Sequence, residues 1–306
     1  MTNPPASSIS VREPTAICLI RPCSAEPLSH ELVNNVARTA RGRSRWLAEG
    51  IAAEIVTEAM TPRTARDLFG RDLEALGMDV LALPARRRRK KLIVADMDST
   101  LITIECIDEL AASIGIRSEV AAITERAMAG ALDFEAALTS RVALLEGVPQ
   151  TAIEEVIREK LRLMPGARRL MATMRAHGAT TAVVSGGFTA FTSHVARVLG
   201  LDIQRANSLE VRDGRLTGRL EGPVVGPRAK LDVLRELAAT HGLYREDTMA
   251  VGDGANDRDM IAEAGLGIAY RARPAVQAVA DLCVNHSDLE SLLFIQGYSK
   301  AEICED

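Results

Sequence analysis

The chain has 306 residues, more than one hydrophobic core usually serves, so its length predicts two domains. Hydrophobic residues make up 47% of the sequence and charged residues 25%, proportions that are typical of a soluble globular protein. The net charge of -4 argues against a general binder of polyanions, and the 3% aromatic content leaves little for a surface that stacks nucleic-acid bases. We therefore expect no nucleic-acid partner.

The N-terminus and the cysteines bear on the compartment. Residues 1–14, which we expect to be disordered, begin without the basic region and apolar stretch of a secretory signal. No run approaches the ~18 apolar residues that a membrane span needs. The five cysteines are odd in number and include no C-x-x-C pair, which favours free thiols in a reducing compartment. These features predict a soluble cytoplasmic protein that does not bind membranes.

The pattern of residues 15–85 predicts a small α+β unit with the ferredoxin-like order βαββαβ. In chain order, the expected elements are a strand at 15–20, a helix at 29–40, two strands within 45–58, a helix at 64–76 and a strand at 78–83. The basic run 86–91 (Arg-Arg-Arg-Arg-Lys-Lys) then marks the expected linker between domains. It could be a nuclear-import or nucleic-acid patch, but a solvated segment ahead of a strand is the simpler interpretation.

From residue 92 to residue 306, short apolar strands alternate with helical stretches. This alternation predicts an α/β fold with a Rossmann-like, doubly wound parallel sheet. The expected core strands lie at 92–95, 180–184, 248–251, 266–269 and 282–284. Residues 105–162 are nearly all helical in pattern and are predicted to form a cap inserted between the first two core strands. Residues 208–226 are predicted to form a strand pair around the turn Asp213-Gly214.

Carboxylates follow the first and third core strands directly. Asp96 ends the first strand and Asp98 can turn back beside it, so one can act as a nucleophile and the other as a proton donor. Asp253, in the motif Gly-Asp-Gly-Ala-Asn-Asp, follows the third strand and can complete a Mg²⁺ site with them, because Mg²⁺ prefers oxygen ligands. Aspartates that cap a turn or a helix are the alternative for each motif alone. An EF-hand loop starting at Asp253 is excluded, since Ala255 and Ala264 stand at two of its ligand positions.

Two further motifs suit a phosphate group. The second core strand ends in Ser185-Gly186-Gly187-Phe188 ahead of a helix, where glycines let the backbone approach an anion and the helix start attracts it. An ordinary strand-to-helix turn is the alternative. Lys230 precedes an expected helix at 231–240, where the helix dipole disfavours a lysine and an oxyanion partner would explain it, although a solvated lysine is commoner. Because all these pieces meet at one edge of the sheet, in chain order, they predict phosphoryl transfer.

The series D-x-D-S-T, S-G-G-F, lysine and G-D-G-x-N-D resembles the phosphatase branch of the haloacid dehalogenase-like superfamily, from about Leu92 to about Leu293. The second aspartate excludes the haloalkanoate dehalogenases of that superfamily, and the lack of membrane helices excludes its ion-pumping ATPases. The cap stretches 104–110, 126–134 and 136–142 are similar to those of phosphoserine phosphatases. The resemblance implies O-phosphoserine as substrate, Mg²⁺ as cofactor and the last step of serine biosynthesis.

The resemblance also implies a role for each matching residue. Asp96 would be the nucleophile that becomes phosphorylated, and Asp98 would exchange the proton. Glu105 would contact the substrate ammonium and Arg141 its carboxylate, a pairing that suits both charges. The metal ligands would be Asp96, Asp98 (through its backbone carbonyl) and Asp253. The other substrate-binding residues would be Ser185, Gly186, Lys230 and Asn256. The residues that support the site would be Met128, Phe134, Gly187 and Asp257. For Met128 and Phe134, plain core packing is an equal alternative.

The N-terminal unit resembles the ACT-like domains that precede some bacterial phosphoserine phosphatases. The glycine-rich first turn of ligand-binding ACT domains is not obvious at residues 22–24, so amino-acid regulation and a role in forming a homodimer both stay open. Three alternatives exist for the whole chain. It could hydrolyse another small phosphate ester, pass the phosphoryl group to an alcohol such as homoserine, or sense an amino acid without catalysis. The intact set of Asp96, Asp98, Lys230 and Asp253 argues against the last.

Overall fold

The computed structural model describes residues 13–128 and 132–305. The chain divides into two compact units, Met1–Arg88 and Arg89–Asp306. The disorder predicted for residues 1–14 concerns a stretch that lies almost wholly outside the described residues. Among the described residues, no helix combines the length and the apolar character that crossing a membrane requires.

From residue 13 onward, where the structure describes it, the first unit is a four-stranded antiparallel sheet with two helices. Its elements are β1 (Thr15–Ile20), α1 (His30–Thr39), β2 (Arg43–Ala48), β3 (Ala52–Thr57), α2 (Pro62–Glu74) and β4 (Asp79–Pro84), and the strand order is β2-β3-β1-β4. Ile17 and Leu19 of β1 share a hydrophobic core with Val33 of α1 and Phe69 of α2. This is the βαββαβ order predicted from the sequence.

The two helices of this unit begin where the sequence offers a cap. Ser29 accepts a hydrogen bond from the backbone N–H of Leu32 at 3.2 Å, and Thr61 accepts one from Thr64 at the same distance. Pro62 takes the first position of α2, where its missing N–H and fixed φ favour a helix start. Local side chains therefore set where both helices begin.

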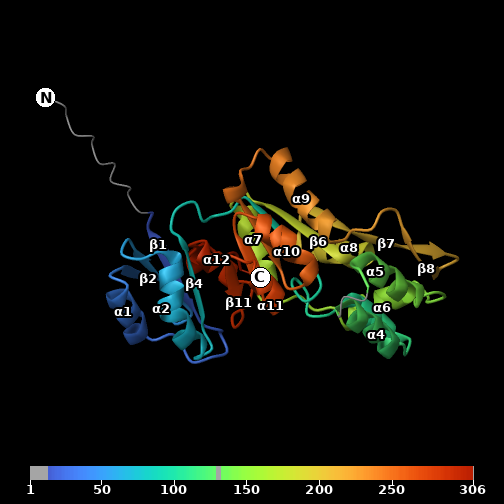
Figure 1. The fold of residues 1–306 in the computed structure, drawn as a ribbon, viewed down its shortest axis with the longest axis horizontal. Coiled ribbons are helices and arrows are strands. Elements are labelled where there is room, and N and C mark those ends of the chain that lie inside the picture. The colour runs from blue at the N-terminus through green and yellow to red at the C-terminus, as the bar shows by residue number, and fades with distance from the viewer. Residues whose placement is uncertain (1–12, 129–131, 306) are drawn as a thin grey trace. The chain divides into compact units, whose positions relative to one another are not determined.

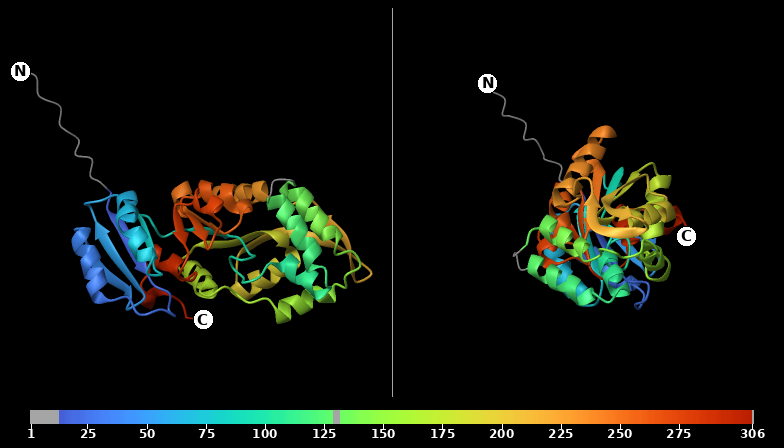
Figure 2. Two further views of the ribbon diagram at one scale, coloured as in Figure 1. Left: turned by 60° about the horizontal axis from the view of Figure 1, so that its bottom comes forward. Right: turned by 90° about the vertical axis from the view of Figure 1, so that its right-hand side faces the viewer.

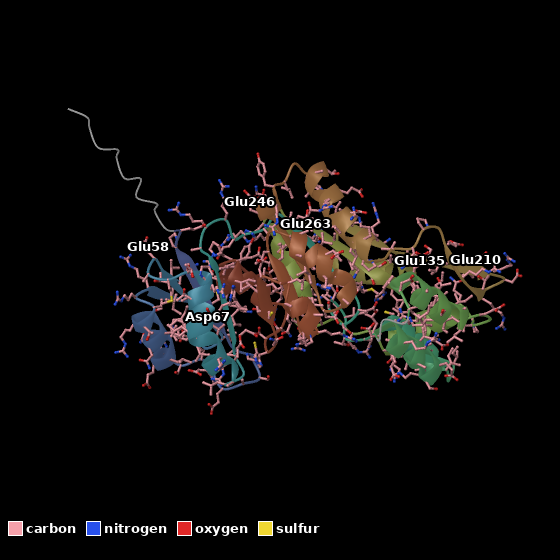
Figure 3. All side chains as sticks on the ribbon, in the orientation of Figure 1. Glu58, Asp67, Glu135, Glu210, Glu246 and Glu263 are labelled. Carbon is pink, nitrogen blue, oxygen red and sulfur yellow. The ribbon has the colours of Figure 1, made fainter. Side chains whose placement is uncertain are left out.

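Four residues of the basic run 86–91 are exposed, as expected of a solvated segment, but Arg88 and Lys90 are not. Arg88 forms an ion pair with Glu54, a carboxylate that is only 2% exposed. Lys90 is 8% exposed and its ammonium donates to the backbone carbonyl of Glu246, labelled in Figure 3, at 2.7 Å. Arg88 and Lys90 thus have partners within their own units. Charge alone does not reveal such contacts, so the sequence did not predict that these two residues are withdrawn from solvent.

The second unit is built on a seven-stranded sheet of order β11-β10-β9-β5-β6-β7-β8. Its strands are β5 (Leu92–Ala95), β6 (Thr180–Phe188), β7 (Ile203–Arg212), β8 (Arg215–Glu221), β9 (Thr248–Gly252), β10 (Gly267–Tyr270) and β11 (Leu282–Val284). All neighbours are parallel except β7 and β8, so the predicted doubly wound parallel sheet is confirmed. The strand β5 has β6 on one side and β9 on the other, which makes its carboxyl end the point where ligands bind in such sheets.

Helices cover both faces of this sheet. The helices outside the cap are α7 (Ala167–Ala176), α8 (Thr189–Leu199), α9 (Pro227–Thr240), α10 (Arg258–Glu263), α11 (Pro274–Gln277) and α12 (Ser291–Ile295). Val94 of β5 shares a core with Val233 of α9, and Ile93, which faces the other way, is also fully buried. Arg235 of α9 donates at 2.9 Å to Glu263 of α10, which is labelled in Figure 3, and so links these two helices.

Between β5 and α7 the described residues form four helices, where a helical cap was predicted. They are α3 (Cys106–Ser113), α4 (Arg117–Met128), α5 (Phe134–Ala143) and α6 (Thr151–Glu159). Figure 1 and the left view of Figure 2 show these helices grouped beside the β7–β8 hairpin. The N–H of Gly147 donates to the carbonyl of Leu216 on β8, and the N–H of Leu216 donates to Val148, each at 2.8 Å. Backbone hydrogen bonds therefore attach the cap to the edge of the sheet.

Two segments differ from the sequence prediction. The strand β7 begins at Ile203, where it pairs in parallel with Ala182 of β6, so the hairpin expected at 208–226 is the edge of the main sheet. The stretch from Ile203 to Arg205 is only partly buried. Its sequence therefore lacks the run of apolar residues from which the other core strands were predicted. The motif Ser185–Phe188, expected to be a turn, continues β6, with a register shift after Val184.

Candidate active site

A cavity of about 470 Å³ lies among the carboxyl ends of β5, β6 and β9 and the cap helices α3 and α5. The predicted site residues that line it are Asp96, Asp98, Glu105, Phe134, Arg141, Ser185, Gly186, Gly187, Asp253 and Asn256. Lys230 and Asp257 are fully buried next to it rather than on its surface. Met128 ends α4, and its side chain lies outside the described residues. The fold thus brings almost all of the predicted set to one place.

Asp96 is held at the end of β5 and is 5% exposed. Its N–H donates to the carbonyl of Val251 at 2.9 Å, which continues the ladder between β5 and β9. Its Oδ1 accepts from the N–H of Met97 at 2.7 Å and lies 2.7 Å from Nζ of Lys230. The same Nζ lies 2.6 Å from Oδ1 of Asp257. Burial alone would lower the pKa of Lys230, but the carboxylates of Asp257 and Asp96 raise it above its usual value, so the ammonium stays charged.

Lys230 does not precede its helix, as the sequence suggested, nor is it solvated. It is the fourth residue of α9, which begins at Pro227, and its side chain is 0% exposed. Ion pairs with Asp96 and Asp257 offset the unfavourable position near the helix N-terminus. The second oxygen of Asp257 accepts from the N–H of Gly254 at 3.0 Å, so this carboxylate holds both the lysine and the turn after β9.

Asp98 lies beside Asp96 but in a different environment. Its Oδ1 accepts from the N–H of Cys106 at 2.9 Å, and its Oδ2 lies 3.4 Å from the hydroxyl of Ser185. Burial first, and then the negative charges of Glu105 and Asp96, raise the pKa of Asp98 to about 7. Asp98 can therefore hold a proton near neutral pH, whereas Asp96 is paired with an ammonium. Two carboxylates with separate environments suit separate roles.

The last residues of β6, Ser185 to Phe188, line the cavity. The N–H of Gly187 donates to the hydroxyl of Ser185 at 2.9 Å. A Cβ at Gly187 would stand 2.7 Å from Oδ2 of Asp98, and one at Gly186 would stand 2.7 Å from the ring of Phe134 on the cap. A side chain at either glycine would therefore displace a neighbour, the carboxylate of Asp98 or the ring of Phe134, although neither glycine has an unusual φ.

Among the residues that the structure describes, three carboxylates could together hold a cation. Single oxygens of Asp96, Asp253 and Asp257 lie within 4.8 Å of one another. Burial, followed by the charges of Asp96 and Glu105, raises the pKa of Asp253 to about 7, which shows that negative charge is concentrated here. Hard oxygen donors and excess negative charge fit Mg²⁺. The carboxylate of Asp98 is not part of this group.

The cap presents opposite charges to the cavity. Glu105 precedes the first residue of α3, and its Oε1 accepts from the hydroxyl of Ser99 at 2.7 Å. Arg141 of α5 is half-buried, and its Nε donates to the carbonyl of Ala137 at 3.3 Å. Within the described residues Arg141 makes no ion pair, so the rest of its guanidinium can meet a ligand. The two residues expected to contact an ammonium and a carboxylate thus line one cavity.

Three residues at the site escaped the sequence argument. Asp108 lines the cavity three residues after Glu105, and this spacing from the N-cap residue into the first turn of α3 was the signal that could have marked it. Thr100 ends the D-x-D-S-T motif, and its hydroxyl donates to Oδ1 of Asp253 at 3.2 Å. Arg273 also lines the cavity, and its N–H donates to the carbonyl of Asp253 at 3.2 Å, but no sequence pattern indicated it.

The core of the second unit matches a known protein family. The family model for haloacid dehalogenase-like hydrolases matches residues 93–262. The chain is 50% identical over 216 residues to phosphoserine phosphatase SerB2 of Mycobacterium tuberculosis, a match that covers 71% of this chain and 53% of that protein. The chain therefore spans about half the length of this relative.

Solved structures extend the comparison to the fold. A HAD family hydrolase from Salmonella enterica serovar Typhi superposes with a TM-score of 0.82 at 30% identity, over 93% of this chain and 99% of that one. A phosphoserine phosphatase in the form of a phospho-aspartyl intermediate analogue superposes with a TM-score of 0.63 at 43% identity, over 67% of this chain and 98% of that one. The chain therefore belongs to the haloacid dehalogenase-like hydrolases, and phosphoserine phosphatases are among its relatives.

Proposed function

We propose that the protein is a Mg²⁺-dependent phosphoserine phosphatase, which hydrolyses O-phospho-L-serine to serine and phosphate. One observation carries the proposal: a single cavity has Asp96 and Asp98 at its sheet edge and Glu105 and Arg141 on its cap. The first pair suits a phosphate ester, and the second pair suits the ammonium and carboxylate of an amino acid. The names of the relatives agree with this substrate.

The proposed reaction proceeds in two steps. In the first, a carboxylate oxygen of Asp96 bonds to phosphorus, the bond between phosphorus and the serine oxygen breaks, and Asp98 gives its proton to that oxygen. In the second, Asp98 takes a proton from water as the water oxygen bonds to phosphorus. The bond between phosphorus and Asp96 breaks, and phosphate leaves. The raised pKa of Asp98 supports its role as the group that both gives and takes the proton.

Other residues would stabilise charge on the phosphoryl group. The ammonium of Lys230, the hydroxyl of Ser185 and the N–H of Gly186 are assigned to its oxygens, and Asp257 keeps Lys230 in place through their 2.6 Å contact. Asp96, Asp253 and the backbone carbonyl of Asp98 would hold Mg²⁺. The metal, when bound, supplies positive charge that neutralises the transferring group.

The cap would exclude water and hold the amino-acid end. The ring of Phe134 lies over Gly186, where a Cβ would stand 2.7 Å from it, so the cap side of the cavity is close to the phosphate side. A ligand as small as phosphoserine can therefore reach both ends. Water that entered freely would weaken every electrostatic contact within the site.

The setting of the reaction is proposed as well. The five cysteines are odd in number and include no C-x-x-C pair, which favours a reducing compartment, and we assign the enzyme to the cytoplasm as the last step of serine biosynthesis. Formation of a homodimer and amino-acid binding by the first unit stay predictions.

The experiment that tests the proposal measures inorganic phosphate released from L-phosphoserine, phosphothreonine, phosphotyrosine and p-nitrophenyl phosphate, each with Mg²⁺ and with EDTA. A strong preference for phosphoserine that EDTA abolishes is expected. Metal-dependent release without that preference would keep the chemistry of Asp96 and refute the substrate. No release from any of the four compounds would refute the function itself.

A further inference from the structure

Asp108 presents a charge to the cavity that the reaction described above does not use. It lies in the first turn of α3, is half-buried and lines the cavity. Its neighbour Glu109 belongs to a different environment, because its carboxylate pairs with Arg117 at 2.6 Å. In the described parts of the chain, the carboxylate of Asp108 forms neither an ion pair nor a hydrogen bond. A carboxylate in a cavity with no protein partner is available to a ligand.

Asp108 acts on both residues that are assigned to the amino-acid end of the substrate. It lies three residues after Glu105, which is the N-cap residue of α3, and both residues line the cavity. Burial lowers the pKa of Arg141, and among the carboxylates that oppose this effect Asp108 is the strongest. Yet Asp108 and Arg141 are not in ion-pair contact. The three charged groups therefore surround a space in which a small zwitterion can lie, with negative groups beside a positive one.

The chemistry of an ammonium group gives Asp108 a use. An ammonium group has several N–H donors, whereas Glu105 already accepts from the hydroxyl of Ser99 at 2.7 Å. A second carboxylate would satisfy a further donor. The net charge that the cap presents to the cavity also affects which ligands bind. The charges of Glu105 and Arg141 cancel each other, so Asp108 makes the net charge of the three residues negative. A negative cap attracts a ligand that carries an ammonium and repels one that carries only a carboxylate.

We infer that Asp108 determines specificity for the amino group: it shares the substrate ammonium with Glu105 and discriminates against phosphate esters that bear a carboxylate without an ammonium. This inference rests on the proposed phosphoserine phosphatase function. It assigns to the enzyme a means of rejecting compounds such as 3-phosphoglycerate, in which a hydroxyl stands in place of the ammonium.

The test compares Asp108→Asn with the wild type on three compounds: phosphoserine, 3-phosphoglycerate and p-nitrophenyl phosphate. The variant should lose about 10- to 100-fold in kcat/KM for phosphoserine, the size of one hydrogen bond to a charged group. It should keep or increase its activity toward 3-phosphoglycerate and keep that toward p-nitrophenyl phosphate. Each phosphorylated acid is also measured as a competitive inhibitor of p-nitrophenyl phosphate turnover, so that binding without turnover still gives a value.

Glu109→Gln is the matched control, since it removes a carboxylate from the same helical turn but not from the cavity. It should leave all three values unchanged. An equal loss on phosphoserine and 3-phosphoglycerate in Asp108→Asn would overturn the inference, because it would mean that Asp108 only positions Arg141. An equal loss on all three compounds, or the same pattern in Glu109→Gln, would overturn it too.

The wild-type protein separates this inference from the function on which it rests. If it shows no preference for phosphoserine over p-nitrophenyl phosphate, the proposed function fails, and the role of Asp108 fails with it. If the wild type prefers phosphoserine and Asp108→Asn keeps the wild-type ratio between phosphoserine and 3-phosphoglycerate, only the role of Asp108 is wrong.

Discussion

The buried ammonium of Lys230 offers a quantitative test of the site. Replacing it in Lys230→Met keeps a side chain of similar length but removes the charge between two carboxylates, which lie 2.7 and 2.6 Å from Nζ. The oxygens of Asp96 and Asp257 would then stand in a buried place without their cation. EDTA must be present, so that a divalent ion cannot take over the missing charge.

The expected loss is large because the pair is buried. Removing one partner of a buried ion pair costs about 3–5 kcal/mol, whereas a surface pair contributes about 0–1 kcal/mol. Lys300→Met is the matched control: its ammonium lies 2.6 Å from Glu290, but Lys300 is 49% exposed, and Glu290 keeps a second cation in Arg169 at 2.8 Å. At about 2–4 °C per kcal/mol for a unit of this size, the melting temperature of the second unit should fall by roughly 6–20 °C in Lys230→Met. It should change by only a few degrees in the control.

Calorimetry in EDTA is the assay, with fluorescence as an internal reference. The chain has a single tryptophan, Trp46, which lies in β2 of the first unit. Its fluorescence therefore reports on the unit that does not contain the substitution. A loss of stability in Lys230→Met no greater than that of the surface control would refute the reasoning, because it would show that the two carboxylates do not depend on the ammonium.

Three further predictions follow from the site. Arg141→Ala should lower kcat/KM for phosphoserine about 100-fold and leave p-nitrophenyl phosphate nearly unchanged, because only the first has a carboxylate for the guanidinium; equal losses in a phosphate-release assay would contradict this. Gly187→Ala should lower kcat on both substrates about 100-fold, since its Cβ would stand 2.7 Å from Oδ2 of Asp98, whereas at Gly70 the nearest atom would be 3.7 Å away and Gly70→Ala should keep full activity. A fully active Gly187→Ala would remove the steric argument. Asp253→Asn should raise the Mg²⁺ concentration for half-maximal activity about tenfold or more, as measured by titration after EDTA treatment; an unchanged midpoint would show that Asp253 is not a ligand.

The sequence predicted those features of the site that depend only on where the core strands end. Asp96 and Asp253 follow apolar strands directly, and parallel strands present their carboxyl ends at one edge, so their proximity could be inferred without coordinates. The inserted helices between β5 and β6 were equally readable, because their pattern interrupts the alternation of strands and helices. Both inferences rest on short-range order and on a general rule of sheet geometry.

What depends on partners far along the chain could not be inferred. Lys230 looked like an ordinary lysine near a helix start, and only the packing of α9 shows that it is buried between Asp96 and Asp257. Arg88 belongs to a run whose charge predicts solvation, but it forms an ion pair with Glu54, which is distant in sequence. Charge and spacing do not report burial, and burial decides whether a charge is structural or solvated.

Trapping the phosphorylated enzyme tests the proposed chemistry at its first step. Asp98→Asn should still accept a phosphoryl group from p-nitrophenyl phosphate, whose leaving group needs no proton, but should hydrolyse the intermediate slowly. Acid quenching followed by peptide mass spectrometry should then find one phosphoryl group on Asp96, and none in Asp96→Asn. Turnover without any phosphorylated peptide, or a phosphoryl group on another residue such as Ser185, would contradict a phospho-aspartate on Asp96.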